Sequence, residues 1–231
     1  MRSIDMTDSI DYESGMVLNI DKPQGMTSFG VVKTVRRLTA CRKVGHAGTL
    51  DPMASGVLVI CTGKATKRVS ECMNMPKVYE GTITLGQTTS TDDAEGETLV
   101  SRDVPPLTED VILSTLSRFE GEIQQVPPMY SAIKQNGQRL YKLARKGVIV
   151  DRKPRTVKIA KINLLRWKDP FIDIRVHCSR GTYIRALARD VGEVLQTGAH
   201  LSYLRRMRVG PYCVEDALTL NAFKTMFSQV V

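Results

Sequence analysis

The sequence is poor in the residues that build disulfide frameworks and metal sites. Its five cysteines are an odd number, and none of them stands in a short paired spacing such as C-x-x-C, which argues against a disulfide framework and a structural zinc site. It has three histidines, and no two of them are within helical reach of each other. We therefore expect no metal, and the unpaired cysteines are typical of a protein in the reducing cytoplasm.

Long hydrophobic runs are also missing. The longest uninterrupted apolar stretch, Val57 to Cys61, is far shorter than the roughly 20 residues of a membrane-spanning helix. The first fifteen residues carry one arginine against four acids, unlike the basic start of a signal peptide. The motifs G-x-x-x-x-G-K-[ST], G-x-G-x-x-G, G-x-S-x-G and H-E-x-x-H are absent. We expect no membrane segment, no signal peptide, and neither nucleotide hydrolysis nor serine-type hydrolysis.

What is present suffices for one folded core. The 231 residues are 42% hydrophobic and 25% charged, as is usual for a globular protein. Residues 1–15 are acidic and aperiodic, which predicts a flexible tail. Because the helices and strands expected after the tail follow no regular alternation, the predicted fold class is α+β. We expect strands at 16–20, 57–61, 78–85, 156–167, 171–178 and 200–209, helices at 28–39 (capped by Ser28), 65–73, 108–119, 140–146, 182–195 and 218–227, a loop at 45–52 and a hairpin turn at Asn136-Gly137.

Positive charge is concentrated in two segments. Residues 33–68 carry eight basic side chains against one acid, and residues 133–168 carry twelve against one. Aromatic residues are interleaved with the second segment, a combination typical of surfaces that bind RNA or single strands by charge and stacking. A solvated lysine-rich face kept for solubility is the alternative. The interleaved aromatic residues are Tyr130, Tyr141 and Trp167.

Asp51 is the carboxylate that local chemistry singles out. It stands between Leu50 and Pro52 in a glycine-rich segment that leads into the apolar strand at 57–61. Burial would force this carboxyl group neutral unless a cation pairs with it, so an ionised Asp51 calls for a neighbouring arginine. From the local pattern alone, an aspartate that caps a turn is the commoner alternative.

Five segments of the chain, in the same order, resemble the motifs of the TruB type of tRNA pseudouridine synthase. The likeness extends across residues 16–216, and its centre is the glycine-rich segment around Asp51. The matching segments are LNIDKPQGMTS at 18–28, GHAGTLDPMASGVL at 45–58, QVPPMYSAIK at 125–134, RGTYIR at 180–185 and HLSYLRR at 200–206.

The resemblance implies a fold and three catalytic residues. The fold is a pseudouridine synthase catalytic domain with a mixed, mostly antiparallel sheet, flanking helices and an RNA-gripping insertion. Asp51 matches the family's catalytic aspartate, Tyr79 matches the tyrosine that stacks on the target base, and Arg185 matches the arginine that pairs with the aspartate. The substrate implied is the uridine at position 55 in the T stem-loop of tRNA.

Four further residues match family positions that contact the RNA. His46 matches the histidine that occupies the space left by the flipped base, and Lys22 matches the lysine of the first motif. Tyr183 and Leu204 match residues that line the uracil pocket. Without the resemblance, these positions would be interpreted as a loop histidine, an exposed turn lysine and ordinary core residues.

The reaction explains why one carboxylate is enough. Pseudouridine formation breaks the bond between C1′ and N1, rotates the base and rejoins it through C5, with no redox change, so no cofactor is expected. The target nucleotide must first be flipped out of the folded loop. Asp51 could attack uracil C6, attack ribose C1′ or remove a ribose proton, and Tyr79 could serve as the base at C5. A glycosidase would need two carboxylates in opposite roles.

The resemblance also sets expectations for domains and partners. We expect residues 16–231 to form the catalytic domain without the C-terminal PUA domain of many family members, so that the basic segment 133–168 bears more of the tRNA affinity. A monomer in the cytoplasm, with no membrane contact and no obligate protein partner, is expected. A tRNA-binding or folding module without turnover is the main alternative. A guide-dependent synthase of a ribonucleoprotein is the other, and it would need long extensions.

Overall fold

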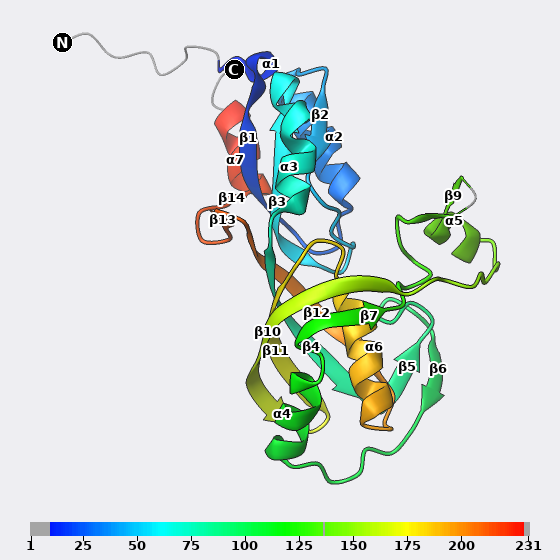
Figure 1. Cartoon of the computed structure of the whole chain (residues 1–231). Helices are drawn as coiled ribbons and strands as arrows, with labels where there is room; N and C mark the ends of the chain where they lie inside the picture. Colours follow the sequence, from blue (N-terminus) through cyan, green and yellow to red (C-terminus); the bar gives the residue numbers. More distant parts are fainter. Residues whose placement is uncertain (1–9, 136, 229–231) are drawn as a thin grey trace. The chain divides into compact units, whose positions relative to one another are not determined.

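The computed structural model describes residues 10–135 and 137–228, and the chain divides into two compact units (Figure 1). Of these residues, 10–75 and 205–228 form the first unit, and 76–135 and 137–204 form the second unit. The chain therefore leaves the first unit once and returns to it once.

The first unit is built around two long paired strands. β1 lies antiparallel to β3, with Leu18 opposite Ile60 and Ile20 opposite Leu58, and β2 pairs with the other edge of β3. Its elements are α1 (Tyr12–Gly15), β1 (Val17–Lys22), α2 (Ser28–Thr39), β2 (Val44–His46), β3 (Ser55–Thr62), the 3₁₀ helix η1 (Gly63–Arg68), α3 (Val69–Asn74), the end of β12 (Ala199–Val209), β13 (Tyr212–Cys213), β14 (Leu218–Thr219) and α7 (Leu220–Ser228).

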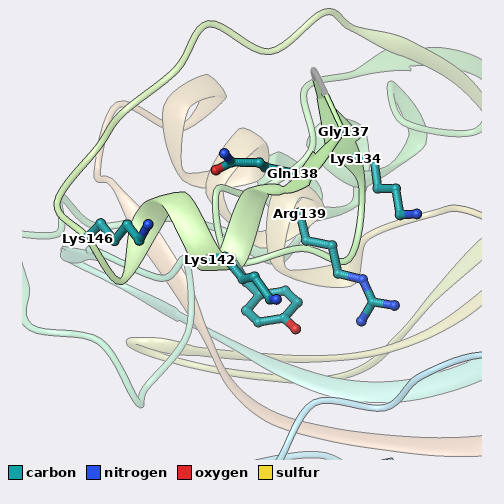
Figure 2. Close-up of a pocket in the computed structure, with 7 residues that line it drawn as sticks. Lys134, Gly137, Gln138, Arg139, Lys142 and Lys146 are labelled. Carbon is teal, nitrogen blue, oxygen red and sulfur yellow. The ribbon is translucent and has the colours of Figure 1, made fainter.

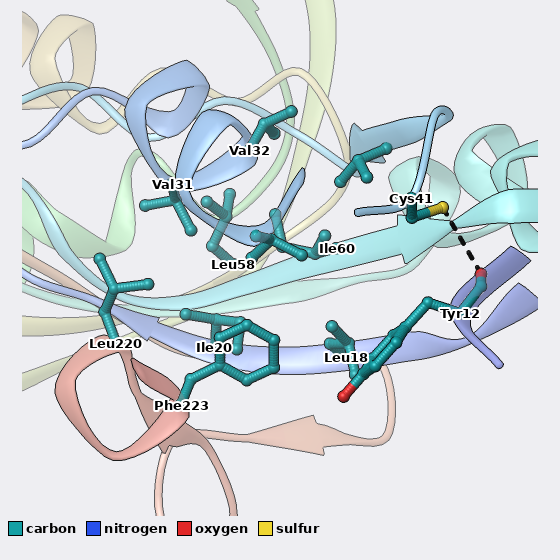
Figure 3. Packing of buried hydrophobic residues seen from close by; sticks show 12 residues of the cluster. Tyr12, Leu18, Ile20, Val31, Val32, Cys41, Leu58, Ile60, Leu220 and Phe223 are labelled. Atoms are coloured by element: carbon teal, nitrogen blue, oxygen red, sulfur yellow. Dashed lines mark hydrogen bonds between the residues drawn. The ribbon is translucent and has the colours of Figure 1, made fainter. Parts of the chain in front are cut away.

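A hydrophobic cluster holds the first unit together. Leu18 and Ile20 of β1 face the buried valines of α2 and Phe223 of α7, as Figure 3 shows. Tyr12 closes the cluster at the other end, where its carbonyl oxygen accepts a hydrogen bond from Cys41 Sγ at 3.6 Å. Burial of apolar surface stabilises the folded state by about 25 cal/mol per Å². The cluster therefore anchors β2 and β3, the strands before and after the Asp51 segment, residues 47–54.

The second unit is an antiparallel sheet with a small insertion, residues 131–151, between β7 and β10. β4 pairs with β11, β11 pairs with β10, and β10 pairs with β7. Its elements are β4 (Lys77–Leu85), β5 (Gln87–Thr89), β6 (Thr98–Ser101), α4 (Glu109–Ser117), β7 (Gly121–Gln125), β8 (Lys134–Gln135), β9 (Gln138–Arg139), α5 (Leu140–Ala144), β10 (Arg155–Lys168), β11 (Phe171–Cys178), α6 (Ile184–Val194) and the start of β12.

Alternating residues of the second sheet form its core. Ile172, Ile174 and Val176 of β11 are fully buried, while the residues between them are not, as the period of two predicts. Helix α6 packs on β4, and α4 packs on β10 and on α6. The N-cap of α4 is Thr108, whose hydroxyl accepts from Val111 N, in agreement with the helix start expected there.

The sheet topology confirms the predicted α+β class. The strand order is β14-β1-β3-β12-β4-β11-β10-β7, and β12 supplies a segment to each unit. Only β1 with β14 and β12 with β3 pair in parallel among the described strand pairs, so the sheet is mixed and mostly antiparallel.

Several local expectations need correction. Residues 12–15 of the expected flexible tail form α1, with Tyr12 buried, because its ring fills the end of the hydrophobic cluster. Thr27, and not Ser28, caps α2. The expected helix 65–73 is a 3₁₀ helix followed by α3, and the expected loop 45–52 begins inside β2. The turn residue Asn136 and positions 1–9 lie outside the described residues.

Candidate active site

The backbone of the Asp51 segment is gripped by a serine from α2. Ser28 Oγ accepts a hydrogen bond from Leu50 N at 2.8 Å and donates one to Leu50 O at 2.9 Å. Ser28 is only 2% exposed. One buried hydroxyl thus satisfies both backbone groups of Leu50, the residue before Asp51. These two bonds restrict the backbone conformation next to the carboxylate.

Lys22 grips the other side of Asp51. Its ammonium group donates to Pro23 O at 2.8 Å, Met26 O at 2.6 Å and Pro52 O at 3.4 Å, and the side chain is fully buried. Gly25 N also donates to Pro52 O. Burial of Lys22 contradicts the exposed turn lysine that the residues alone suggest, because the ammonium lies on carbonyl oxygens inside the first unit. Its part in RNA binding stays a prediction.

Arg206 binds backbone carbonyl oxygens before and after Asp51. Its Nε donates to Val57 O at 2.6 Å and its Nη2 donates to Gly48 O at 3.1 Å, while the residue is 1% exposed. Gly48 has a φ of +94°, a conformation that favours glycine. Asp51 itself is half-buried, and its carbonyl oxygen accepts from Ala54 N at 3.1 Å in a tight turn.

His46 lies at the end of β2, opposite Ile60 of β3. The ring is half-buried, and its Nδ1 is buried without a hydrogen-bond partner among the described residues. Burial, and after it the positive charge of Arg206, lower the pKa of His46 below the ordinary histidine value. The imidazole is therefore neutral at pH 7.

The lowered pKa predicts a pH-dependent stability that His46→Gln removes. An unfolded histidine takes up its proton near pH 6.5, before the folded His46 does, so the free energy of unfolding falls as the pH drops through about 6.5. Urea unfolding at about pH 7.5 and about pH 5.5 measures this loss. The variant is expected to lose less stability than the wild type over this interval, and equal losses would contradict the assignment.

In the second unit, Arg185 lies in the first turn of α6 and is 4% exposed. Its guanidinium donates to Thr91 O at 2.9 Å and Tyr130 O at 2.8 Å, and it forms an ion pair with Asp93 Oδ2 at 3.4 Å. Asp51 belongs to the first unit and Arg185 to the second. The pairing of Asp51 with Arg185 stays a prediction.

The other predicted residues of the second unit are well ordered by their neighbours. Tyr183 is the N-cap residue of α6, and the buried Gln125 side chain both accepts from Tyr183 N at 2.8 Å and donates to Tyr183 O at 3.1 Å. Tyr79 is half-buried on β4, and Leu204 on β12 is 5% exposed. Leu204 lies close to the backbone of Gly81, two residues after Tyr79 on the same strand.

Sequence analysis missed the residues that position these side chains. Asp93 and Gln125 are polar and 3% and 1% exposed, and each bonds to a predicted site residue. The sequence signal of Asp93 is weak, because an isolated aspartate in a turn-rich segment is ordinary, whereas Gln125 begins one of the segments of family resemblance. Ser28 and Arg206 fall inside segments of family resemblance, although their partners at Leu50, Gly48 and Val57 could not be read from the sequence.

A basic hollow of about 590 Å³ lies in the small insertion of the second unit (Figure 2). Lys134 and Arg139 reach it from the β8–β9 hairpin, Lys142 from α5, and Lys146 from the turn that follows α5. All four side chains are exposed. Beside them the Arg145 guanidinium lies 5.6 Å from the Tyr141 ring centre, so charge and an aromatic face occur together. The remaining residues of the hollow are Gly137, Gln138 and Tyr141.

Two other features bear on function. Over residues 10–135 and 137–228, no cluster of three or more histidine, cysteine or acidic side chains is arranged to hold a metal ion. Within the same described ranges, no helix has both the length and the apolar character needed to cross a membrane.

Comparison with known families gives two matches that follow one another along the chain. Residues 36–184 match the model of the TruB family pseudouridylate synthase (N terminal domain). Residues 185–229 match the model of the tRNA pseudouridylate synthase B C-terminal domain.

Similar curated proteins come from several bacteria. The chain is 48% identical over 227 residues to tRNA pseudouridine synthase B of Phocaeicola vulgatus, covering 95% of this chain and 96% of that protein. It is 48% identical over 210 residues to tRNA pseudouridine synthase B of Syntrophotalea carbinolica, covering 91% of this chain and 69% of that protein.

Solved structures share the fold. A crystal structure of a Cbf5-Nop10-Gar1 complex has a TM-score of 0.73 at 32% identity, covering 95% of this chain and 57% of that chain. A structure of an H/ACA RNP bound to a substrate RNA containing 2′-deoxyuridine has a TM-score of 0.68 at 30% identity, covering 93% of this chain and 55% of that chain.

Proposed function

Because the chain belongs to the TruB family of pseudouridylate synthases, we propose that it isomerises the uridine at position 55 in the T loop of tRNA to pseudouridine. The observation that carries the proposal is the Asp51 segment. It matches the family's signature, and buried groups of Ser28, Lys22 and Arg206 hold its backbone on both sides of the aspartate. Such preorganisation suits a group that must act on a reacting atom.

In this proposal Asp51 is the catalytic nucleophile or base. Tyr79 stacks on the target base and could remove the C5 proton, and Arg185 pairs with the aspartate. Arg185 is itself oriented by Asp93 and by two backbone carbonyls, so its guanidinium has a defined direction. No cofactor takes part, because the reaction needs neither an oxidant nor an external reactant.

The remaining residues serve recognition of the flipped nucleotide. His46 takes the space that the base leaves, which offsets part of the few kcal/mol that unstacking costs, and Tyr183 and Leu204 line the uracil pocket. Lys22 serves RNA recognition through the backbone that it holds. Because its buried ammonium binds Pro52 O, it positions the segment that carries Asp51.

The insertion around α5 supplies tRNA affinity in this proposal. Lys142→Glu and Lys146→Glu are each expected to weaken tRNA binding about 3-fold to 10-fold and to reduce the salt dependence by about one counterion. Filter binding at two salt concentrations measures both. Arg118→Glu is the matched control, since Arg118 is exposed at the C-cap of α4, outside the basic segment. Binding by both lysine variants equal to that of the control would contradict this role.

We propose that the chain works as a monomer in the cytoplasm, with tRNA as its partner and without an obligate protein partner. The five free cysteines support the assignment to the reducing cytoplasm. The H/ACA structures to which the chain is similar are ribonucleoprotein assemblies by their descriptions.

Tritium release tests the function directly. Pseudouridine has the mass of uridine, but its formation expels the hydrogen on uracil C5. The purified protein, without metal or nucleotide, is expected to release about one tritium per tRNA from a transcript labelled at uracil C5. A transcript with cytidine at position 55 is the control and should release none from that site. Tight tRNA binding without release would favour an RNA-binding module instead.

A further inference from the structure

Helix α6 carries two arginines, one turn apart, that contact the same two chain segments. One segment is the acidic loop, residues 90–96, and the other is the stem, residues 126–130, which leads directly into the insertion, residues 131–151. Arg185 binds Thr91 and Asp93 of the acidic loop and Tyr130 of the stem. The established family role of Arg185 does not explain its neighbour Arg189.

Arg189 contacts the same two segments one turn further along the helix. We call this double link from α6 to the acidic loop and the stem the bracket. Its Nη1 lies 3.0 Å from Asp92 Oδ2 in the acidic loop, and its Nη2 donates to Val126 O in the stem at 3.0 Å. The same guanidinium lies 2.8 Å from Asp190 Oδ1. Arg189 and Asp92 are each 18% exposed at the side chain, so the pair is shielded from water. A planar guanidinium can hold these partners at once in fixed directions.

Arginine side chains hold the backbone of the stem, in which Pro127 and Pro128 are buried. Its carbonyl oxygens accept from three arginines, because Arg152 Nη1 also donates to Pro127 O at 3.1 Å. Two prolines occupy positions 127 and 128 and contribute no backbone N–H. The stem therefore depends on side-chain donors where a strand would use its neighbours.

The acidic loop is a firm support for the bracket. Asp92 has a φ of +60°, and Leu201 N of β12 donates to Asp92 O at 3.0 Å. Burial raises the pKa of Asp92, and Arg189 is the foremost of three arginines that oppose this rise. Removing the guanidinium would leave a buried carboxyl group without its nearest cation.

We propose that Arg189, with Asp92, is a positioning residue that fixes the register between the RNA-binding insertion and Arg185. The insertion holds the RNA, the stem connects it to α6, and Arg189 joins the stem to the helix that carries Arg185. This inference rests on the proposed function. Loosening the bracket displaces the bound nucleotide from the catalytic groups, which costs rate more than affinity.

Single-turnover kinetics test the inference with Arg189→Met, Arg189→Lys and Asp92→Asn. The rate of tritium release at saturating enzyme is expected to fall about 10-fold or more in the two Arg189 variants, while the Kd for tRNA stays within about 2-fold. Lysine keeps the charge but lacks the fork, so it should not rescue. Arg175→Met is the matched control, because Arg175 pairs with Glu80 in the same unit away from the stem. Wild-type rates in the folded Arg189 variants would overturn the proposal.

Hydrogen exchange gives a readout that does not need turnover. The amides of Ser131 and Tyr141 bond to Met129 O and Ser131 O at the base of the insertion. Both are expected to exchange at least several-fold faster in Arg189→Met and Arg189→Lys, with the amides of β11 unchanged. Unchanged exchange in the insertion would overturn the inference. If the wild type released no tritium, the proposed function would fail, while this exchange result would still decide the bracket.

Discussion

Asp51→Asn is expected to lower the rate of tritium release by at least about 10³-fold, because an amide at pH 7 is neither a nucleophile nor a base. The change is nearly isosteric. The backbone of the segment keeps its bonds to Ser28, Lys22 and Arg206, so the variant should fold and bind tRNA like the wild type. Single-turnover tritium release and filter binding measure the two properties separately.

The control for this prediction is Asp103→Asn, which makes the same chemical change on an exposed residue of the second unit. It should leave the rate within about 2-fold, as is usual for surface substitutions. A rate of Asp51→Asn within 10-fold of the wild type would show that the carboxylate is not the reacting group. Full loss of tRNA binding by Asp51→Asn would point to a structural role.

Gly56→Ala is expected to lower the free energy of unfolding by about 3 kcal/mol or more. Gly56 is the second residue of β3, the strand that follows the Asp51 segment, and its φ is +102°. A Cβ placed there would lie 2.2 Å from Arg206 O and 2.7 Å from Arg206 N. Both atoms are backbone, so relief requires moving β12 away from β3. Urea unfolding followed by circular dichroism measures the loss.

Gly45→Ala is the matched control in the same part of the chain. A Cβ at this position meets Val69 Cγ2 at 3.6 Å, an ordinary contact, and Gly45 is absent from the glycines with positive φ. Its effect is expected to stay within about 1 kcal/mol. Similar losses in both variants would show that the close approach of Arg206 to Gly56 does not limit stability. A lower tritium-release rate in Gly56→Ala below its unfolding temperature would connect this approach to the position of Asp51.

Local sequence patterns predicted the long elements well. The alternation in β11 and the continuous apolar run in β3 reflect burial on one face and on both faces of a sheet, and both strands are confirmed. Helix α2 ends at Thr39 as expected, although Phe29, which stands at helical spacing from the buried Val32, is 55% exposed. The difference arises because helical spacing defines a stripe of residues and leaves its edges open.

The short strands, and the pairings that they make, could not be predicted from the sequence. β2, β13 and β14 have two or three residues each, too few for a period to show, and they form because a longer strand offers its edge. β5 is equally short and pairs with the four-residue β6. The burial of Lys22 likewise could not be predicted from the sequence. A lysine after a strand and before Pro23 suggests a solvated turn, and only the folded chain brings Met26 O and Pro52 O to its ammonium.

By itself the sequence determined the family, the α+β class and the identity of the candidate catalytic residues, since these depend on residue order and on apolar spacing along the chain. Only the tertiary structure decided what surrounds them. Arg206 reaches Gly48 across more than 150 positions and Arg185 reaches Thr91 across more than 90. Such bonds join residues that no local period relates, because hydrogen bonding of buried polar groups is satisfied in space and not along the chain.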